Sequence, residues 1–169
     1  MNFIPGLELS ARYYNEVVRP ILESNYPELR HSAALIGHGS EVLGFDTPQS
    51  MDHDWGPRVL LFIAEEDNAK FGKNILETLH NKVPEIYLGF PTRIKVEQNE
   101  QEELRVEIHT VESYFSHCTH EKGILLNINK QFNEIDWLTF PQQELLTLTA
   151  GKVHHDGLGT LTKIREKLS

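Results

Sequence analysis

Two short apolar runs, at residues 32–36 and 59–64, constrain the fold of this chain more than any other feature. Both are too short for an ordinary buried helix, and the second is apolar on both faces, as a central strand of a sheet is. Gly37 and Gly39 follow the first run at once, which indicates a sharp turn. The sequence therefore predicts two buried strands, the first of which ends in a glycine turn.

The remaining periodicity predicts helices and one pair of strands around these two runs. Ser10 is the expected N-cap of the first helix. The predicted helices lie at residues 10–25, 40–43, 69–82, 141–153 and 160–168, and the predicted paired strands at 86–96 and 104–111. Strands come first and helices cluster late, so we expect an α/β or α+β fold, a small mixed sheet flanked by helices.

The length of 169 residues fits one domain, residues 1–169, with a core at about 1–115 and a helical C-terminal segment at about 116–169. No apolar run approaches the roughly 20 residues of a membrane helix, so we expect no membrane partner. The N-terminus has no secretory pattern, and Cys118 is the single cysteine. These features predict a cytoplasmic protein.

The charge of the chain limits its partners. Acidic residues outnumber basic ones by 25 to 16, which gives a net charge near −9. Such a surface repels a phosphate backbone, so we expect no long nucleic acid as a partner. A nucleoside triphosphate remains compatible with an acidic protein because it arrives with magnesium.

Two polar motifs between the apolar runs carry the candidate chemistry. Gly39 and Ser40 could offer backbone N–H groups and a hydroxyl to a phosphate, although a plain turn also explains them. Asp52 and Asp54 stand two apart, so on an extended segment their carboxylates face the same way and can share a metal ion. The alternative for the aspartates is that they cap local turns.

Two further residues complete the candidate site. Glu107 lies on a predicted strand and faces away from its apolar side, so it could be a third metal ligand, a general base or a plain surface glutamate. Arg58 could bind a phosphate through its planar fork, or pair with Asp46 or Glu41 as a structural clamp.

Aromatic and histidine side chains near these motifs have simpler interpretations. Trp55 could stack on a base, but a tryptophan between two strands is more often part of the core. His154 and His155 could bind a metal or shuttle protons. We favour a helix C-terminal region that ends at Gly157, since adjacent helical residues do not point at one target.

The order of strand, Gly-Ser turn, Asp-x-Asp and next strand resembles the polymerase-beta-type nucleotidyltransferase superfamily over residues 33–63. Gly44, four residues after Ser40, matches the usual second glycine. The sequence departs from the pattern at Met51, which separates Ser50 from Asp52 where the superfamily has serine directly before the first aspartate.

Within that superfamily the chain is similar to a bacterial family that is labelled a domain of unknown function. The similarity covers nearly the whole chain, through residues 17–20, 43–48, 52–58, 136–138, 145–151 and 154–157. Members of that family continue into a further helical region, so the resemblance implies that this chain stops within the helical segment.

The resemblance implies an enzyme that moves a nucleoside monophosphate from a nucleoside triphosphate to a small-molecule or protein acceptor. Gly39 and Ser40 would hold the β- and γ-phosphates, and Asp52 and Asp54 would hold Mg²⁺ or Mn²⁺. A catalytically silent nucleotide- or partner-binding module with the same fold is the alternative. A phosphohydrolase that uses the same carboxylates is a third interpretation.

Overall fold

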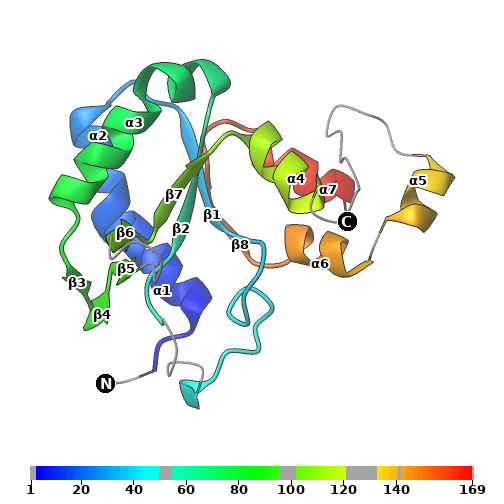
Figure 1. Cartoon of the computed structure of the whole chain (residues 1–169), viewed down its shortest axis with the longest axis horizontal. Coiled ribbons are helices and arrows are strands. Elements are labelled where there is room, and N and C mark those ends of the chain that lie inside the picture. The colour runs from blue at the N-terminus through cyan, green and yellow to red at the C-terminus, as the bar shows by residue number, and fades with distance from the viewer. Residues whose placement is uncertain (1–2, 50–54, 96–101, 121–132, 141, 169) are drawn as a thin grey trace.

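The computed structural model describes residues 3–49, 55–95, 102–120, 133–140 and 142–168. Figure 1 shows the arrangement of its helices and strands. The helical elements are α1 (Gly6–Tyr13), the π-helix η1 (Tyr14–Val18), α2 (Arg19–Asn25), α3 (Glu65–Lys82), α4 (Val111–His120), α5 (Glu134–Thr139), α6 (Gln142–Thr149) and α7 (Leu161–Leu168). The strands are β1 (His31–Leu35), β2 (Val59–Ile63), β3 (Ile86–Tyr87), β4 (Phe90–Pro91), β5 (Arg93–Lys95), β6 (Glu102–Leu104), β7 (Val106–His109) and β8 (Lys152–Asp156).

A mixed sheet of four strands, in the order β7-β2-β1-β8, forms the centre of the fold (Figure 1). The two apolar runs are its inner strands, β1 and β2, and every residue of both is buried. These two strands pair antiparallel, while β2 and β7 run parallel. The predicted buried strands are therefore confirmed.

Helices cover both faces of this sheet and bury two separate apolar clusters. On one face lie α1, η1, α2 and α3, whose Leu9, Tyr13 and Ile75 pack with Leu61 of β2. On the other face lie α4, α6 and α7, which pack around Phe62 of β2. Figure 1 shows the two helical layers on opposite sides of the strands. The predicted fold class, a small mixed sheet flanked by helices with a C-terminal helix, is confirmed.

The N-terminal helix starts earlier than the sequence predicted. It begins at Gly6, with Pro5 in the cap position, so Ser10 is not an N-cap but a fully buried residue inside the helix. The backbone N–H of Gly6 donates instead to Asp46 Oδ2 at 2.7 Å, which satisfies one free donor of the first turn. The helix widens into η1 and narrows again at α2, where Pro20 stands in the first turn and has no N–H to donate.

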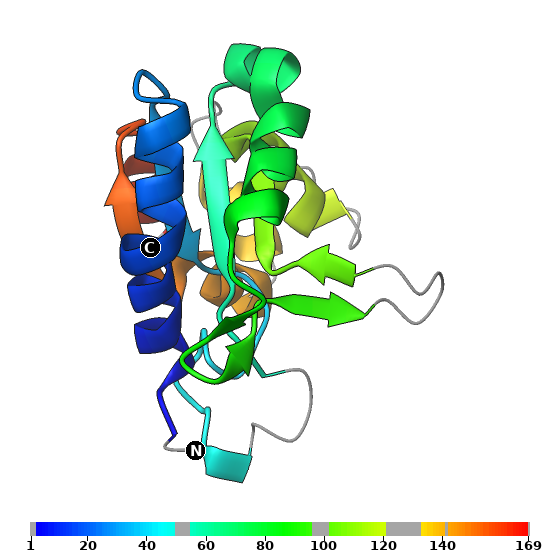
Figure 2. The ribbon, with the colours of Figure 1, turned by 90° about the vertical axis from the view of Figure 1, so that its left-hand side faces the viewer.

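The predicted strand pair 86–96 and 104–111 is broken into shorter pieces. Leu88 and Gly89 both have positive φ, 51° and 88°, and close a tight hairpin between β3 and β4. Strands β5 and β6 form a second hairpin, and both hairpins project from the sheet in Figure 2. The predicted helix 40–43 is a single hydrogen-bonded turn, in which Phe45 N–H donates to Ser40 O at 2.9 Å.

The predicted helix 141–153 ends early, because residues 152–156 form β8 and complete the sheet beside β1. His154 and His155 are therefore strand residues, and the expected helix C-terminal cap is wrong. The register between β1 and β8 shifts at a bulge between Ala33 and Ala34. The ring of His154 lies 6.3 Å from that of Tyr14, and the ring of His155 lies 6.2 Å from it. The sequence pattern did not predict β8, because a single edge strand between helices carries no periodic signal of its own.

In the part of the chain that the structure describes, no helix combines the length and the apolar character needed to cross a membrane.

Candidate functional site

The turn that follows β1 has a backbone conformation that only glycine adopts easily. Gly37, Gly39 and Gly44 have φ of 94°, 142° and 73°. The Gly37 N–H donates to Thr147 O at 2.9 Å, and Tyr114 Oη donates to Ile36 O at 3.2 Å. A Cβ on Gly37 would collide with that same Tyr114 hydroxyl, so glycine is required here for space as well as for φ. Helices α4 and α6 thus fix the turn predicted to bind phosphate.

Ser40 is exposed at the surface of this turn, and its hydroxyl has no hydrogen-bond partner among the described residues. Gly39 lies beside the Glu41 side chain, whose carboxylate oxygens would stand 2.5 and 2.7 Å from a Cβ on that glycine. The space over Gly39 therefore holds an anionic group that belongs to the protein itself.

Arg58 comes directly before β2 and ties the turn to this strand. Its Nη2 donates to His38 O at 2.7 Å and to Glu41 Oε1 at 3.0 Å. Of the two predicted structural partners of Arg58, the structure thus shows Glu41. Asp46 instead accepts a hydrogen bond from the N–H of Gly6. The buried Arg58 Nε has no partner among the described residues, so its N–H is available as a donor.

Glu107 lies on β7, and the parallel register places it opposite Leu60 of β2. Residues that pair across a sheet share a face, so Glu107 lies on the side of Leu60, away from Val106. Its side chain is 51% exposed, and its Oε2 lies 3.1 Å from His109 Nε2. The hydrogen bond from His109, and then the charges of His109 and Arg58, lower the pKa of Glu107 although partial burial opposes this.

Sequence reasoning missed His109 as a partner of Glu107. The two stand two residues apart on one strand, so the alternation of side chains was a signal that could have paired them. The His109 ring also forms an edge contact with the Tyr114 ring, whose centroid is 5.2 Å away, and a tilted contact with the Phe62 ring at 6.2 Å. These contacts hold the ring beside the carboxylate.

A second connection missed from sequence runs from the other face of the sheet to Arg58. Ser10 Oγ donates to Arg58 O at 2.5 Å and accepts from His154 Nε2 at 2.8 Å, so the neutral His154 ring carries its proton on Nε2. Burial lowers the pKa of His154 to about 4, and the charge of Lys152 adds to the effect. The residue that precedes β2 is therefore connected through Ser10 to a buried imidazole whose charged form is disfavoured.

The structure links Gly39 to Arg58 through Glu41, and the charge of Arg58 lies close enough to Glu107 to lower the pKa of its carboxyl. Ser40 is exposed on the same turn as Gly39, whereas Asp52 and Asp54 lie outside the described residues. No group of three or more His, Cys, Asp or Glu side chains suited to a metal ion occurs among the described residues. Trp55 packs its ring 5.9 Å from that of Phe3 and against the first apolar cluster, in agreement with the core interpretation.

Comparison with known proteins gives one match. The model of a domain of unknown function, DUF4037, matches residues 137–169, which include α6, β8 and α7. No curated protein and no solved structure matches the chain. The matched family has no stated activity, so the function has to be argued from the geometry.

Proposed function

We propose that the protein is a metal-dependent nucleotidyltransferase, which moves a nucleoside monophosphate from a nucleoside triphosphate to a hydroxyl or amine of a small-molecule or protein acceptor. The observation that carries this proposal is the position of Glu107. Its carboxylate stands on β7 beside the start of β2, the strand that Asp52 and Asp54 precede in the sequence. A metal site that contains an Asp-x-Asp segment needs a further carboxylate, which a neighbouring strand can supply.

The chemistry of Glu107 supports a metal ligand over a general base. Its pKa is lowered, so the group is ionised at neutral pH and is a weak proton acceptor. Half of its side chain is open to solvent, which leaves its oxygens accessible. Asp52, Asp54 and Glu107 together form an oxygen donor set of the kind that Mg²⁺ and Mn²⁺ prefer.

The glycine turn and Arg58 supply the groups for the triphosphate. The Ser40 hydroxyl and the backbone N–H groups of the turn would contact the terminal phosphates, and Arg58 would turn its fork from Glu41 to a phosphate oxygen. When bound, the metal neutralises charge on the triphosphate as pyrophosphate leaves. The acceptor oxygen or nitrogen bonds to the α-phosphorus, the bond to the β-phosphate breaks, and the acceptor proton passes to solvent.

The Glu41 carboxylate over Gly39 favours a second candidate, a catalytically silent module that keeps the fold. If Glu41 permanently occupies the place of a phosphate, the turn does not bind a nucleotide and the Arg58 pair is purely structural. The two candidates differ in one measurable property, which is binding of a triphosphate in the presence of magnesium.

The deciding experiment is a titration of the protein with each common nucleoside triphosphate, with and without Mg²⁺. The proposal expects binding that requires the metal and is lost in the double variant Asp52→Asn, Asp54→Asn, whose circular dichroism should match the native protein. Release of pyrophosphate with a suitable acceptor would then establish transfer, whereas release of inorganic phosphate would indicate a hydrolase. Absence of binding by the folded native protein would leave the silent module.

A further inference from the structure

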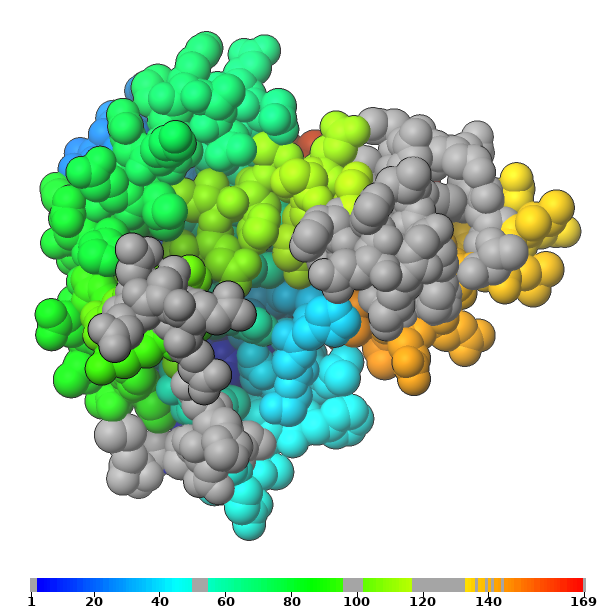
Figure 3. All heavy atoms as spheres, in the orientation of Figure 1, coloured from blue at the N-terminus to red at the C-terminus, as the bar shows by residue number. Residues whose placement is uncertain are grey.

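A hollow of about 670 Å³ lies at the end of the sheet opposite the glycine turn. It is bounded by Ile63 and Ala64 where β2 ends, by Thr110 and Val111 where β7 ends, and by the segment that joins β8 to α7. In Figure 3 the surface is indented at this edge, between α3 and the start of α4. We call this hollow the switch groove.

The switch groove follows from the way the chain leaves the sheet. Helix α3 follows β2 and packs Ile75 and Leu79 on one face, whereas α4 follows β7 and packs Tyr114 and Phe115 on the other. Two adjacent parallel strands whose following helices diverge to opposite faces leave a crevice at their carboxyl ends. Ligands of sheets flanked by helices commonly occupy such a crevice.

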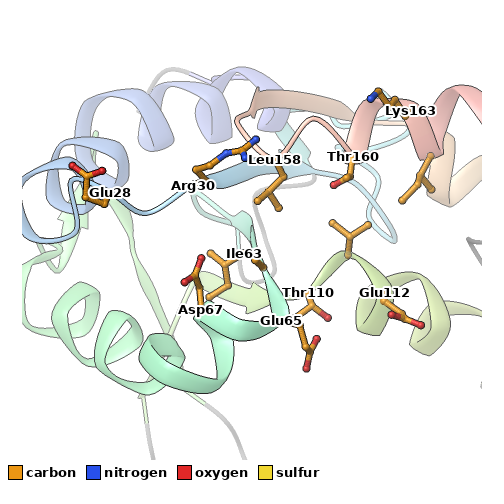
Figure 4. Close-up of a pocket in the computed structure, with 13 residues that line it drawn as sticks. Glu28, Arg30, Ile63, Glu65, Asp67, Thr110, Glu112, Leu158, Thr160 and Lys163 are labelled. Carbon is orange, nitrogen blue, oxygen red and sulfur yellow. The ribbon is translucent and has the colours of Figure 1, made fainter.

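The walls of the switch groove are apolar. Ile63 and Val111 are 2% and 9% exposed, and both contribute to its lining together with Leu158 and Ile164. Figure 4 shows Leu158 and Thr160 on one side pointing across the gap toward Ile63 and Thr110 on the other. An aliphatic or aromatic body would therefore find apolar contacts on both sides.

Carboxylates dominate the rim of the switch groove. Glu28, Glu65, Asp67 and Glu112 line it, against the two cations Arg30 and Lys163. The guanidinium of Arg30 already donates to Gly157 O at 2.9 Å. None of the four carboxylates forms a side-chain hydrogen bond or ion pair with another described residue. Within the described part of the chain, the rim thus presents carboxylates without ion-pair partners around an apolar interior.

We propose that the switch groove binds an organic cation of small-molecule size, with an apolar body and one or more ammonium groups. The body would lie between Ile63 and Leu158, and the ammonium groups would reach the carboxylates of Asp67 and Glu112 from α3 and α4. The volume fits a small ligand. This inference does not depend on the proposed nucleotidyltransferase activity.

A neighbouring hollow of about 200 Å³ extends the switch groove. It shares Glu28 and Asp67 with the first hollow and adds Tyr26, Leu29 and Phe71. Phe71 lines this hollow and is 42% exposed. Glu28 and Asp67 thus lie where the two hollows meet.

The test uses three probes with the same aliphatic chain and different ends: octamethylenediamine, the matching diol and the matching dicarboxylate, suberate. Each is titrated into the full chain by calorimetry and by nuclear magnetic resonance of the backbone amides. We expect saturable binding of the diamine that weakens with salt, with shifts at Ala64, Val111 and Leu158. The diol should bind more weakly, and suberate should not bind.

Matched variants locate the binding. The double variant Asp67→Asn, Glu112→Gln should lower the affinity for the diamine by roughly fivefold to tenfold, as loss of one or two partly exposed charge pairs does. Glu66→Gln is the control, because Glu66 lies in the same first turn of α3 but outside the lining of the groove. Equal affinity of the double variant and the control, no diamine binding, or tighter binding of suberate would overturn the proposal.

Discussion

The two ends of the central sheet are built in opposite ways. At the Gly39 end, glycines with positive φ, a single exposed serine and Arg58 create a polar turn suited to an anion. At the Ala64 end, Ile63 and Val111 create apolar walls, and the rim is acidic. One small sheet thus carries two surfaces of contrasting chemistry.

Helices begin at both ends of the sheet, and the charged side chains beside their first turns differ. Helices α3 and α4 begin at the Ala64 end, and the positive ends of their dipoles stabilise Glu65, Asp67 and Glu112 there. At the Gly39 end α1 begins, with the N–H of Gly6 donating to Asp46, and the carboxylate beside Gly39 is Glu41, which is held by Arg58. We therefore expect anions to compete with Glu41 at one end and cations to bind at the other.

The largest expected effect separates the two ends by activity. Glu107→Gln should lower nucleotidyl transfer at least about a hundredfold, equivalent to roughly 3 kcal/mol of transition-state stabilisation, because a metal ligand is lost. It should leave binding of octamethylenediamine unchanged. Glu112→Gln should weaken binding of octamethylenediamine and leave nucleotidyl transfer unchanged. If each variant changes both nucleotidyl transfer and diamine binding, the two sites are coupled and the contrast between the two ends of the sheet is wrong.

Acid should destabilise the whole protein through the histidine that supports the Gly39 end. The pKa of His154 is lowered to about 4 by burial, so the unfolded chain gains its proton first as the pH falls below about 6.5. Stability is therefore fully present above pH 6.5 and is lost progressively down to about pH 4, by up to about 3 kcal/mol. Burial also lowers the pKa of His31, which acts in the same direction.

Urea unfolding at a series of pH values measures this loss. In His154→Gln the side-chain amide can still donate to Ser10 but does not titrate, so the slope of stability against pH should be smaller than in the native protein. An unchanged slope would mean that other groups, such as the paired carboxylates, control the acid sensitivity.

Glycine substitutions should show how much the backbone conformation of the turn at the Gly39 end contributes to the free energy of unfolding. Gly37→Ala should cost about 2–3 kcal/mol, because the methyl group adds a collision with the Tyr114 hydroxyl to the strain of positive φ. Gly44→Ala is the control, with φ of 73° but no atom within 4 Å of the new Cβ, and should cost only about 1 kcal/mol. Equal losses of unfolding free energy would show that the contact with Tyr114 has no energetic role.

The smallest expected effect concerns Glu41. Glu41→Gln removes the negative charge beside Gly39 and weakens the hold on Arg58, so triphosphate affinity should rise by roughly twofold to fivefold. Calorimetric titration with Mg²⁺ measures the change. A fall in affinity would instead mean that the Glu41 pair holds Arg58 in its productive position.

The sequence determined the inner part of this fold. The apolar runs of β1 and β2 are buried on both faces in any packed arrangement, and positive φ is open to glycine, so strands and turn could be predicted without tertiary information. The clamp between Arg58 and Glu41 was one of the alternatives that the sequence left open.

Only the tertiary structure decided which distant segments meet. It paired β8 with β1, placed Glu107 beside the entry to β2, and linked Ser10 to His154 across 144 positions of the chain. It also placed the switch groove, whose walls come from separate strands and helices. Local patterns report only neighbours in sequence, whereas these contacts depend on register and on which face each helix covers.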